Sequence, residues 1–253
     1  MRPARLVPAA AALLLLAPAA GAQSSAPGGP RPSRFSVGLD GVVMDPRGSF
    51  GRNVSSVGFG IGGHALLRVD PRGILALRAD LSGSQYGSEE EQFDAPLFYT
   101  GRVGLEVVTR NSLSWVGIGP ELSVPIGPVR PYVNASVAYA RFSTTSDLRG
   151  GGYDAYGNYR SNQRIASSQN QADGTGARSA GAGVYVAVGP ARWLTSAHAG
   201  VRYFDGGRAE YLREGSIVDE PDGGISFTPL RSRTPFVAYQ LGVSVAIPRS
   251  GRR

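Results

Sequence analysis

Residues 236–247 read FVAYQLGVSVAI, and this stretch decides the fold. From Val237 to Ile247 every odd position is apolar, whereas the positions between them hold Ala, Gln, Gly, Ser and Ala. A period of two over this length predicts a β-strand with two different faces. One face is rich in Val and Leu, and the other is too small to cover a core. This contrast is typical of a strand with lipid on one side and a crowded, polar barrel interior on the other.

The same alternation recurs along the chain. The other runs lie at 35–43, 57–69, 74–84, 97–107, 116–124, 133–139, 181–188 and 193–203. Single-chain bacterial barrels have even numbers of strands, so these nine runs leave two options. Either one run is not a separate strand, or a tenth strand lies in a loop. We predict an all-β fold, an antiparallel up-and-down transmembrane β-barrel of eight strands, with ten as the alternative.

The N-terminus predicts a cleaved secretory signal peptide at 1–22. Arg2 and Arg5 give a positive start, an apolar region follows at 9–18, and Ala20-Gly21-Ala22 supplies a small-residue cleavage site. The apolar region is about half the length that a spanning helix needs, roughly 20 residues. The rest of the chain is predicted to comprise a flexible lead-in at 23–33, the barrel domain at 34–248 and a basic tail at 249–253.

Composition narrows the possible functions. The 253 residues include no cysteine, which excludes disulfides and thiolate metal sites. The net charge is +7, and every basic residue is arginine. Acidic residues are interleaved with the arginines and no basic block exists, so we expect no binding of nucleic acid.

Segments between the runs predict the loops. The polar stretches 144–178 and 205–233 lack alternation and are predicted to be long extracellular loops, whereas 70–73 and 125–131 are predicted to be short periplasmic turns. The acidic stretch 87–96 is predicted to be a further loop, which a count of nine strands puts on the periplasmic side. It could hold Ca²⁺ loosely, but a solvated run of charge is the favoured interpretation.

The signal sequence, the strand lengths, the segment GPVRPYVNASVAYARF at 127–142 and the closing strand together resemble the small outer-membrane β-barrel family, that is, OmpA-like and OmpW-like porin-type barrels. The resemblance covers nearly all of the mature chain. It implies a location in the bacterial outer membrane, with outer-membrane lipid as a partner. Members of the family usually end on an aromatic residue, whereas here Ile247 is followed by Pro248 and a basic tail. No peptidoglycan-binding domain follows, so cell-wall anchoring is not implied.

Strand parity predicts a charged barrel interior. The residues expected there are Asp40, Arg68, Arg78, Asp80, Arg102, Glu106, Glu121 and Arg202. The two signs are equal in number, and side chains just fill the interior of an eight-stranded barrel, so a plug of ion pairs is favoured. The alternative is a charged, selective channel in a wider barrel. Four polar side chains are expected beside these charges: His64, Asn134, His198 and Gln240.

The two histidines carry the most reactive chemistry in the predicted interior. With a carboxylate they could ligate a metal, or one could act as a base. Outer-membrane deacylases carry His two residues before Ser, but His64 is followed by Ala-Leu and His198 by Ala-Gly. The favoured interpretation is that carboxylates satisfy both histidines, with no cofactor, no metal site and no enzymatic activity.

The predicted function is a non-enzymatic outer-membrane barrel with a narrow or plugged lumen. Its expected roles are envelope integrity and extracellular contact through the segments 144–178 and 205–233. A small pore or carrier for hydrophobic or small polar solutes is the alternative, and an outer-membrane lipid-modifying enzyme is a more distant one. A soluble β-sandwich would have to bury the Val and Leu face of every strand.

Overall fold

The computed structural model describes residues 33–54, 56–97, 101–153, 159–188, 195–213, 216–219 and 225–247. The predicted signal peptide, nearly all of the lead-in and the basic tail lie outside this part. No helix among the described residues is long and apolar enough to span a membrane.

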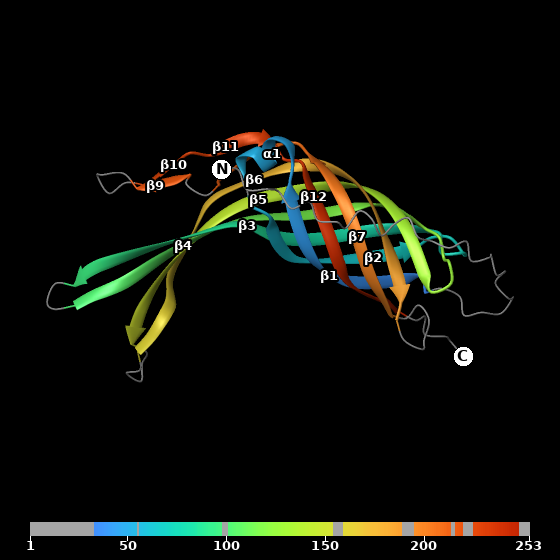
Figure 1. Cartoon of the computed structure of the whole chain (residues 1–253), viewed down its shortest axis with the longest axis horizontal. Coiled ribbons are helices and arrows are strands. Elements are labelled where there is room, and N and C mark those ends of the chain that lie inside the picture. The colour runs from blue at the N-terminus through green and yellow to red at the C-terminus, as the bar shows by residue number, and fades with distance from the viewer. Residues whose placement is uncertain are drawn as a thin grey trace, which may run out of the picture. The chain divides into compact units, whose positions relative to one another are not determined.

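Eight antiparallel strands form a closed ring (Figure 1). Around the ring they are β1 (Phe35–Pro46), β12 (Phe236–Ile247), β7 (Thr195–Gly206), β6 (Tyr159–Ala187), β5 (Val129–Tyr153), β4 (Gly101–Ser123), β3 (Leu75–Leu97) and β2 (Gly58–Arg68). The first and last strands close the ring, with Phe35 opposite Ile247 and Val43 opposite Tyr239. The predicted eight-stranded antiparallel barrel is confirmed.

Two of the predicted runs, 97–107 and 116–124, belong to the single strand β4, which explains why the sequence shows nine runs. Arg110 and Asn111 do not turn the chain, because they pair with Ser88 and Gly87 of β3. The acidic stretch 87–96 is therefore an arm of the β3–β4 hairpin and not a loop. It lies at the barrel end opposite the short turns, the same end as the hairpin of β5 and β6.

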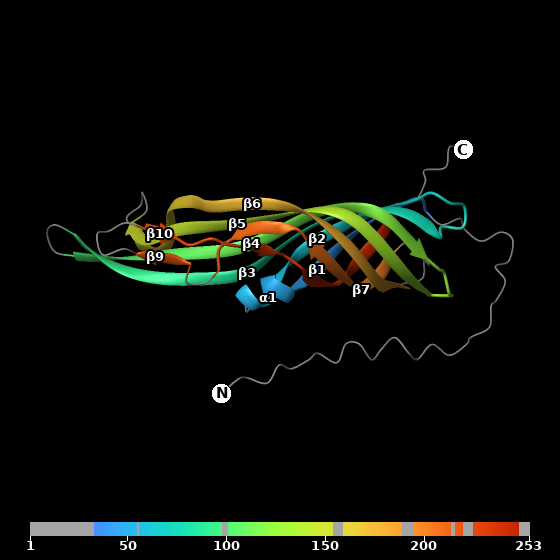
Figure 2. The ribbon, with the colours of Figure 1, turned by 90° about the horizontal axis from the view of Figure 1, so that it is seen from above.

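Four strands continue beyond the barrel wall. The pairing of β2 with β3 ends at Gln85, and that of β6 with β7 begins at Ala177, yet the β3–β4 and β5–β6 hairpins extend further. Both hairpins project from the ring (Figures 1 and 2). We call these projecting parts of β3 to β6 the hairpin extension. The prediction of a loop at 144–178 was therefore wrong, because most of that segment pairs as β-sheet.

The second predicted loop, 205–233, contains short strands. β8 (Arg208–Tyr211) pairs with β11 (Leu230–Arg233), and β9 (Ile217–Asp219) pairs with β10 (Ile225–Phe227). The α-helix α1 (Gly48–Asn53) lies beside β11, with Ser49 Oγ donating to the Arg233 carbonyl at 2.9 Å. Figure 1 shows α1 and β11 at the hairpin end of the barrel, with β9 and β10 further from the ring.

Tight turns close the opposite end. The Asp70 carboxylate accepts hydrogen bonds from the backbone N–H groups of Arg72 (3.0 Å) and Leu75 (2.7 Å). Gly73 completes this turn with φ +69°, a conformation that L-residues with a side chain rarely adopt. In this turn and the one near Gly127 (φ +60°), only a few residues link neighbouring strands.

The outer wall of the barrel is apolar. Ile61 is 71% exposed and Leu241 is 70% exposed. The residues that form this apolar band are Phe35, Val37, Leu39, Phe59, Ile61, Leu67, Leu75, Leu77, Leu81, Val116, Ile118, Leu122, Val133, Val137, Tyr139, Val186, Val201, Tyr203, Leu241, Val243, Val245 and Ile247. On β1 the outward alternation runs from Phe35 to Val43, roughly 27 Å along the strand. A tilt of about 40° leaves roughly 20 Å across, close to the band height of outer-membrane barrels.

The interior at the hairpin end is apolar as well. Phe50 of α1 is fully buried there, with edge-on contacts to Tyr86, Phe142 and Tyr211 at centroid distances of 5.6, 5.4 and 5.0 Å. The aromatic cluster, as we name it, consists of Phe50, Tyr86, Trp115, Phe142, Phe204, Tyr211 and Phe236. The expectation of a polar interior was therefore wrong for this end of the barrel.

Candidate functional site

An ion-pair network fills the middle of the barrel. The Arg78 guanidinium donates to Asp80 Oδ1 at 2.7 Å through Nε and to Glu121 Oε2 at 3.0 Å through Nη1. The same Nη1 donates to the Tyr185 hydroxyl at 2.9 Å. Arg78 and Glu121 are both 1% exposed. Burial of these charges is tolerable only because each has a partner of opposite sign.

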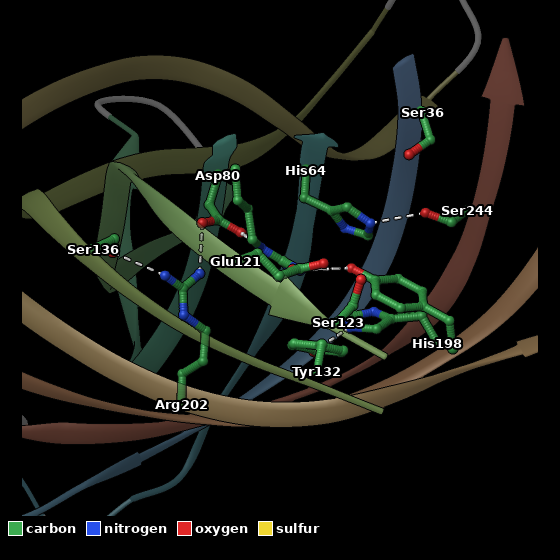
Figure 3. Close-up of polar contacts among 12 residues, drawn as sticks. Ser36, His64, Asp80, Glu121, Ser123, Tyr132, Ser136, His198, Arg202 and Ser244 are labelled. Atoms are coloured by element: carbon green, nitrogen blue, oxygen red, sulfur yellow. Dashed lines mark hydrogen bonds and ion pairs between the residues drawn. The ribbon is translucent and has the colours of Figure 1, made fainter. Parts of the chain in front are cut away.

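Arg202 extends the network from the opposite wall. Its Nη1 lies 2.6 Å from Asp80 Oδ2, and its Nη2 donates to the hydroxyls of Ser136 (2.9 Å) and Ser179 (3.0 Å). Asp80 therefore bridges two arginines from β3 and β7, as Figure 3 shows for Arg202. The network joins strands on different sides of the ring and leaves this layer filled by side chains.

Asp40 organises a second cluster, made by residues of β1, β2, β5, β7 and β12. Its Oδ2 accepts a hydrogen bond from His64 Nδ1 and its Oδ1 from His198 Nδ1, both at 2.8 Å. The second ring nitrogen of each histidine meets a hydroxyl, with Ser244 Oγ 2.9 Å from His64 Nε2 and Tyr132 OH 2.5 Å from His198 Nε2. All five side chains are buried. We call this set the His–Asp–His cluster, and Figure 3 shows His64 with Ser244 and His198 with Tyr132.

Two glycines make room for this cluster. A Cβ at Gly38 would collide with the His64 ring and the Ser244 hydroxyl, and a Cβ at Gly242 would collide with the Asp40 carboxylate. Gly38 and Gly242 both lie on the inward face, where parity placed small residues. The small inward-facing residues of β1 and β12 therefore leave room for the side chains of His64 and Asp40.

The order Ser244–His64–Asp40 is that of a hydrolytic triad, with the carboxylate on Nδ1 and the hydroxyl on Nε2. Ser244 also lines a cavity at the turn end, together with Arg68, Arg130 and Tyr185. The cavity has a volume of about 20 Å³, enough for roughly one water molecule. It offers a substrate no room, so the described residues favour a positioning network over a catalytic one.

The structure brings most of the sequence-predicted interior residues together. Asn134 and Gln240 are buried in the lumen beside the two clusters, and Arg68 is half-buried at the turn end, where Nη1 donates to the Ser33 carbonyl at 2.9 Å. Two residues lie elsewhere. Arg102 pairs with Pro96 in the hairpin extension, and its side chain lies outside the described part of the structure.

The predicted position of Glu106 in the lumen was wrong. Since β4 is one uninterrupted strand, its alternation carries through from Glu121, and the even-numbered Glu106 lies on the opposite face. Glu106 also lies in the hairpin extension, opposite Gln92 and Arg149. The prediction failed because it treated 97–107 and 116–124 as two strands with independent parity, whereas both fall in β4.

Ser136, Tyr185 and Ser244 alternate with outward apolar residues in the runs 133–139, 181–188 and 236–247, but no role was predicted for them. Tyr132 was missed altogether, although it precedes Val133, which was predicted to face outward. Their hydroxyls complete the hydrogen bonds of Arg202, Arg78 and the two histidines. A search for inward hydroxyls next to inward charges would have found them.

In the hairpin extension, Asp147 makes polar contacts with both neighbouring strands. The side chain of Ser167 donates to the Asp147 carboxylate, and Arg110 Nη1 donates to Asp147 Oδ2 at 2.7 Å. The hydrogen bond from Ser167, the hydrogen bond from Arg110 and the nearby charge of Arg164 hold the pKa of Asp147 below its usual value. Asp147 therefore stays ionised and ties β5 to both neighbouring strands.

No protein-family model and no curated protein matches this sequence. Solved structures with a similar arrangement are outer-membrane or surface proteins of bacteria. Neisserial surface protein A is 17% identical over 85% of this chain and 98% of its own, with a TM-score of 0.44. Ail, the attachment invasion locus protein of Yersinia pestis, solved with the heparin analogue sucrose octasulfate, is 10% identical over 85% and 97%, with a TM-score of 0.39.

A major outer membrane protein from Thermus thermophilus is similar to the same degree. It is 11% identical over 84% of this chain and 98% of its own, with a TM-score of 0.42. Because these scores are all low, the assignment of the fold rests on the hydrogen-bonded ring of this chain.

Proposed function

We propose that this chain is a non-enzymatic protein of the bacterial outer membrane, with a closed lumen and with the hairpin extension presented outside the cell. In this role it contributes to envelope integrity and contacts extracellular partners through β3 to β6 and the segment 205–233. The observation that carries the proposal is the filled interior, because the aromatic cluster and the ion-pair network together occupy the lumen inside the apolar band.

The apolar band supports the membrane part of the proposal. Soluble monomers rarely expose contiguous apolar patches beyond a few hundred Å², whereas here all eight strands contribute exposed apolar residues to the band. Short turns at one end and long hairpins at the other are typical of barrels with periplasmic turns and extracellular loops. Tyr139, Tyr203 and Tyr239 lie on the hairpin side of the band, where outer-membrane barrels carry an aromatic girdle.

A matched pair of substitutions tests the band. Ile61→Arg puts a charge on the lipid face and is expected to destabilise the barrel by about 2–4 kcal/mol in phospholipid vesicles. Ile165→Arg, at an isoleucine 59% exposed in the hairpin extension, is expected to change stability by less than about 0.5 kcal/mol. Reversible urea unfolding of both variants measures the difference. Equal effects would mean that residue 61 faces water and that the wall is no membrane surface.

The hairpin extension supports the contact part of the proposal. Residues 164–169 are all exposed, and their sequence RIASSQ is mostly polar. Four strands paired by backbone hydrogen bonds present this surface, so a partner would meet a pre-ordered sheet and not a flexible loop.

The absence of native cysteine allows a direct test of which end is outside. We expect Ser168→Cys, in the hairpin extension, to react in intact cells with a polyethylene-glycol maleimide too large to cross the outer membrane. Arg72→Cys, in an exposed turn at the other end, should react only after the outer membrane is permeabilised. Both cysteines should react equally in detergent. Labelling of residue 72 in intact cells would contradict the proposed orientation.

A small pore remains the alternative function, because outer-membrane barrels of this size can also carry solutes. It would need a path past the aromatic cluster and past Arg78, Asp80, Glu121 and Arg202, all at most 3% exposed. A lipid-modifying enzyme has less support, since Ser244 faces a cavity that holds roughly one water.

A further inference from the structure

We propose that Asp40, His64 and His198 form a binding site for one divalent transition-metal ion of the Zn²⁺ type. The three residues come from β1, β2 and β7, so the barrel assembles them only on closing. One ligand atom of each residue lies within 4.8 Å of those of the other two. Both Nδ1 nitrogens face the Asp40 carboxylate, each 2.8 Å from one of its oxygens, so we take these nitrogens and an Asp40 oxygen as the ligand atoms.

The charge of Asp40 supports a cation at this point. Asp80 and Glu121 each form an ion pair with a guanidinium, whereas the ion-pair partners of Asp40 in the described chain are the two imidazoles alone. An imidazole neutralises the charge of a carboxylate only as the imidazolium cation, with a proton on each ring nitrogen. A buried carboxylate at 2% exposure needs a counter-charge, and a divalent ion held by both Nδ1 atoms would supply it.

The outer hydrogen bonds fit metal ligation. A histidine that binds through Nδ1 carries its proton on Nε2, and that proton usually has an acceptor that fixes the ring. Ser244 Oγ and Tyr132 OH lie at these two positions, at 2.9 and 2.5 Å. Hydroxyls both donate and accept. Each ring can therefore move its proton from Nδ1 to Nε2 without losing a partner.

The donor set selects the class of ion. Two imidazoles and one carboxylate suit Zn²⁺ and its neighbours in the first transition row, whereas Mg²⁺ prefers six oxygen ligands. The site lies above the small cavity at the turn end, which Ser244 also lines. Arg68 and Arg130 line the same cavity and repel an incoming cation, so binding should be faster when metal is present during folding than when it is added afterwards.

The first test is titration of the refolded, metal-stripped barrel with Co²⁺, monitored by visible d–d absorption. The second is thermal unfolding of the barrel with and without Zn²⁺. We expect stoichiometric binding of Co²⁺, its displacement by Zn²⁺, and a Zn²⁺-dependent rise of several degrees in the unfolding temperature, because ligand binding to the native state stabilises it. Mg²⁺ should have no effect. Asp40→Asn and His64→Gln should abolish the cobalt spectrum.

The matched control is Glu121→Gln, which neutralises a carboxylate as deeply buried as Asp40 but in the ion-pair network. It should keep the spectrum. If Asp40→Asn fails to fold, Ser244→Ala and Tyr132→Phe provide the second measurement, with affinity expected to fall about 10–100-fold. Absence of cobalt absorption in the wild type would overturn the proposal and leave an imidazole proton as the counter-charge. Binding unchanged in Asp40→Asn would overturn it too, and would point to the acidic stretch of β3.

Discussion

Arg78→Met is expected to destabilise the barrel by about 3–5 kcal/mol, because it removes one partner of a buried ion pair and leaves the other. Glu121 would lose the Arg78 guanidinium and keep the hydrogen bond from the Tyr185 hydroxyl, at 3.3 Å. Asp80 would keep Arg202. The methionine fills much of the space of the arginine stem, so the loss reports the charge and not a cavity. Reversible urea unfolding in vesicles, followed by tryptophan fluorescence, measures it.

Two further variants separate charge from packing. Arg78→Met combined with Glu121→Gln removes the orphaned carboxylate and should recover most of the lost stability, since replacing both members of a buried pair is often neutral. Arg164→Met, at an exposed arginine in the hairpin extension, should change stability by less than about 0.5 kcal/mol. A double variant as unstable as the single one would show that Arg78 acts through its hydrogen bonds and packing alone.

The barrel was predictable wherever its strands separate lipid from a polar interior. At β12 the predicted strand and the observed one coincide, because Val and Leu alternate there with Ser and Gly. The same contrast identified the inward faces that carry Asp40, Arg78 and Asp80. Local sequence was enough for these residues because each strand faces two different environments.

The hairpin extension was not predictable in this way, for a physical reason. Where both faces of a strand meet water, no contrast in hydropathy marks the alternation. Residues 164–169 are uniformly exposed although they belong to β6. Pairing there depends on hydrogen bonds to β5, and the sequence of one strand does not show which other strand it pairs with. Glu106 was misplaced because β4 continues through 108–115, whereas the runs 97–107 and 116–124 were predicted as separate strands.

The sequence also did not predict which side chains contact one another across the lumen. Asp40 and His198 are 158 positions apart, and only ring closure brings them within hydrogen-bond distance. Parity correctly gave the inward side of both residues but not which of the inward charges meet. The sequence did not predict the aromatic cluster. Trp115 and Phe236 face an apolar interior, and the outer face of their strands is also apolar, so the two faces do not differ in hydropathy.

Phe50→Ala is expected to destabilise the barrel by about 3–5 kcal/mol, the usual loss for a buried phenylalanine. Phe50 is fully buried and packs edge-on against three rings, and it attaches α1 to the mouth. Phe50→Leu, which keeps an apolar side chain, should lose less. Urea unfolding gives the magnitude. Proteolysis near 47–56 should increase as well, because the remaining ties of α1 are single hydrogen bonds such as that from Asn53 to Tyr211.

Conductance in planar bilayers distinguishes the two layers of the plug. We expect the wild type to be silent and Phe50→Ala to remain silent, because the network of Arg78, Asp80, Glu121 and Arg202 still fills the lumen below the mouth. Discrete openings in Phe50→Ala would mean that the aromatic cluster alone closes the barrel and that ions pass the charged layer. Openings in the wild type, altered in Glu121→Gln, would replace the closed barrel with a selective pore.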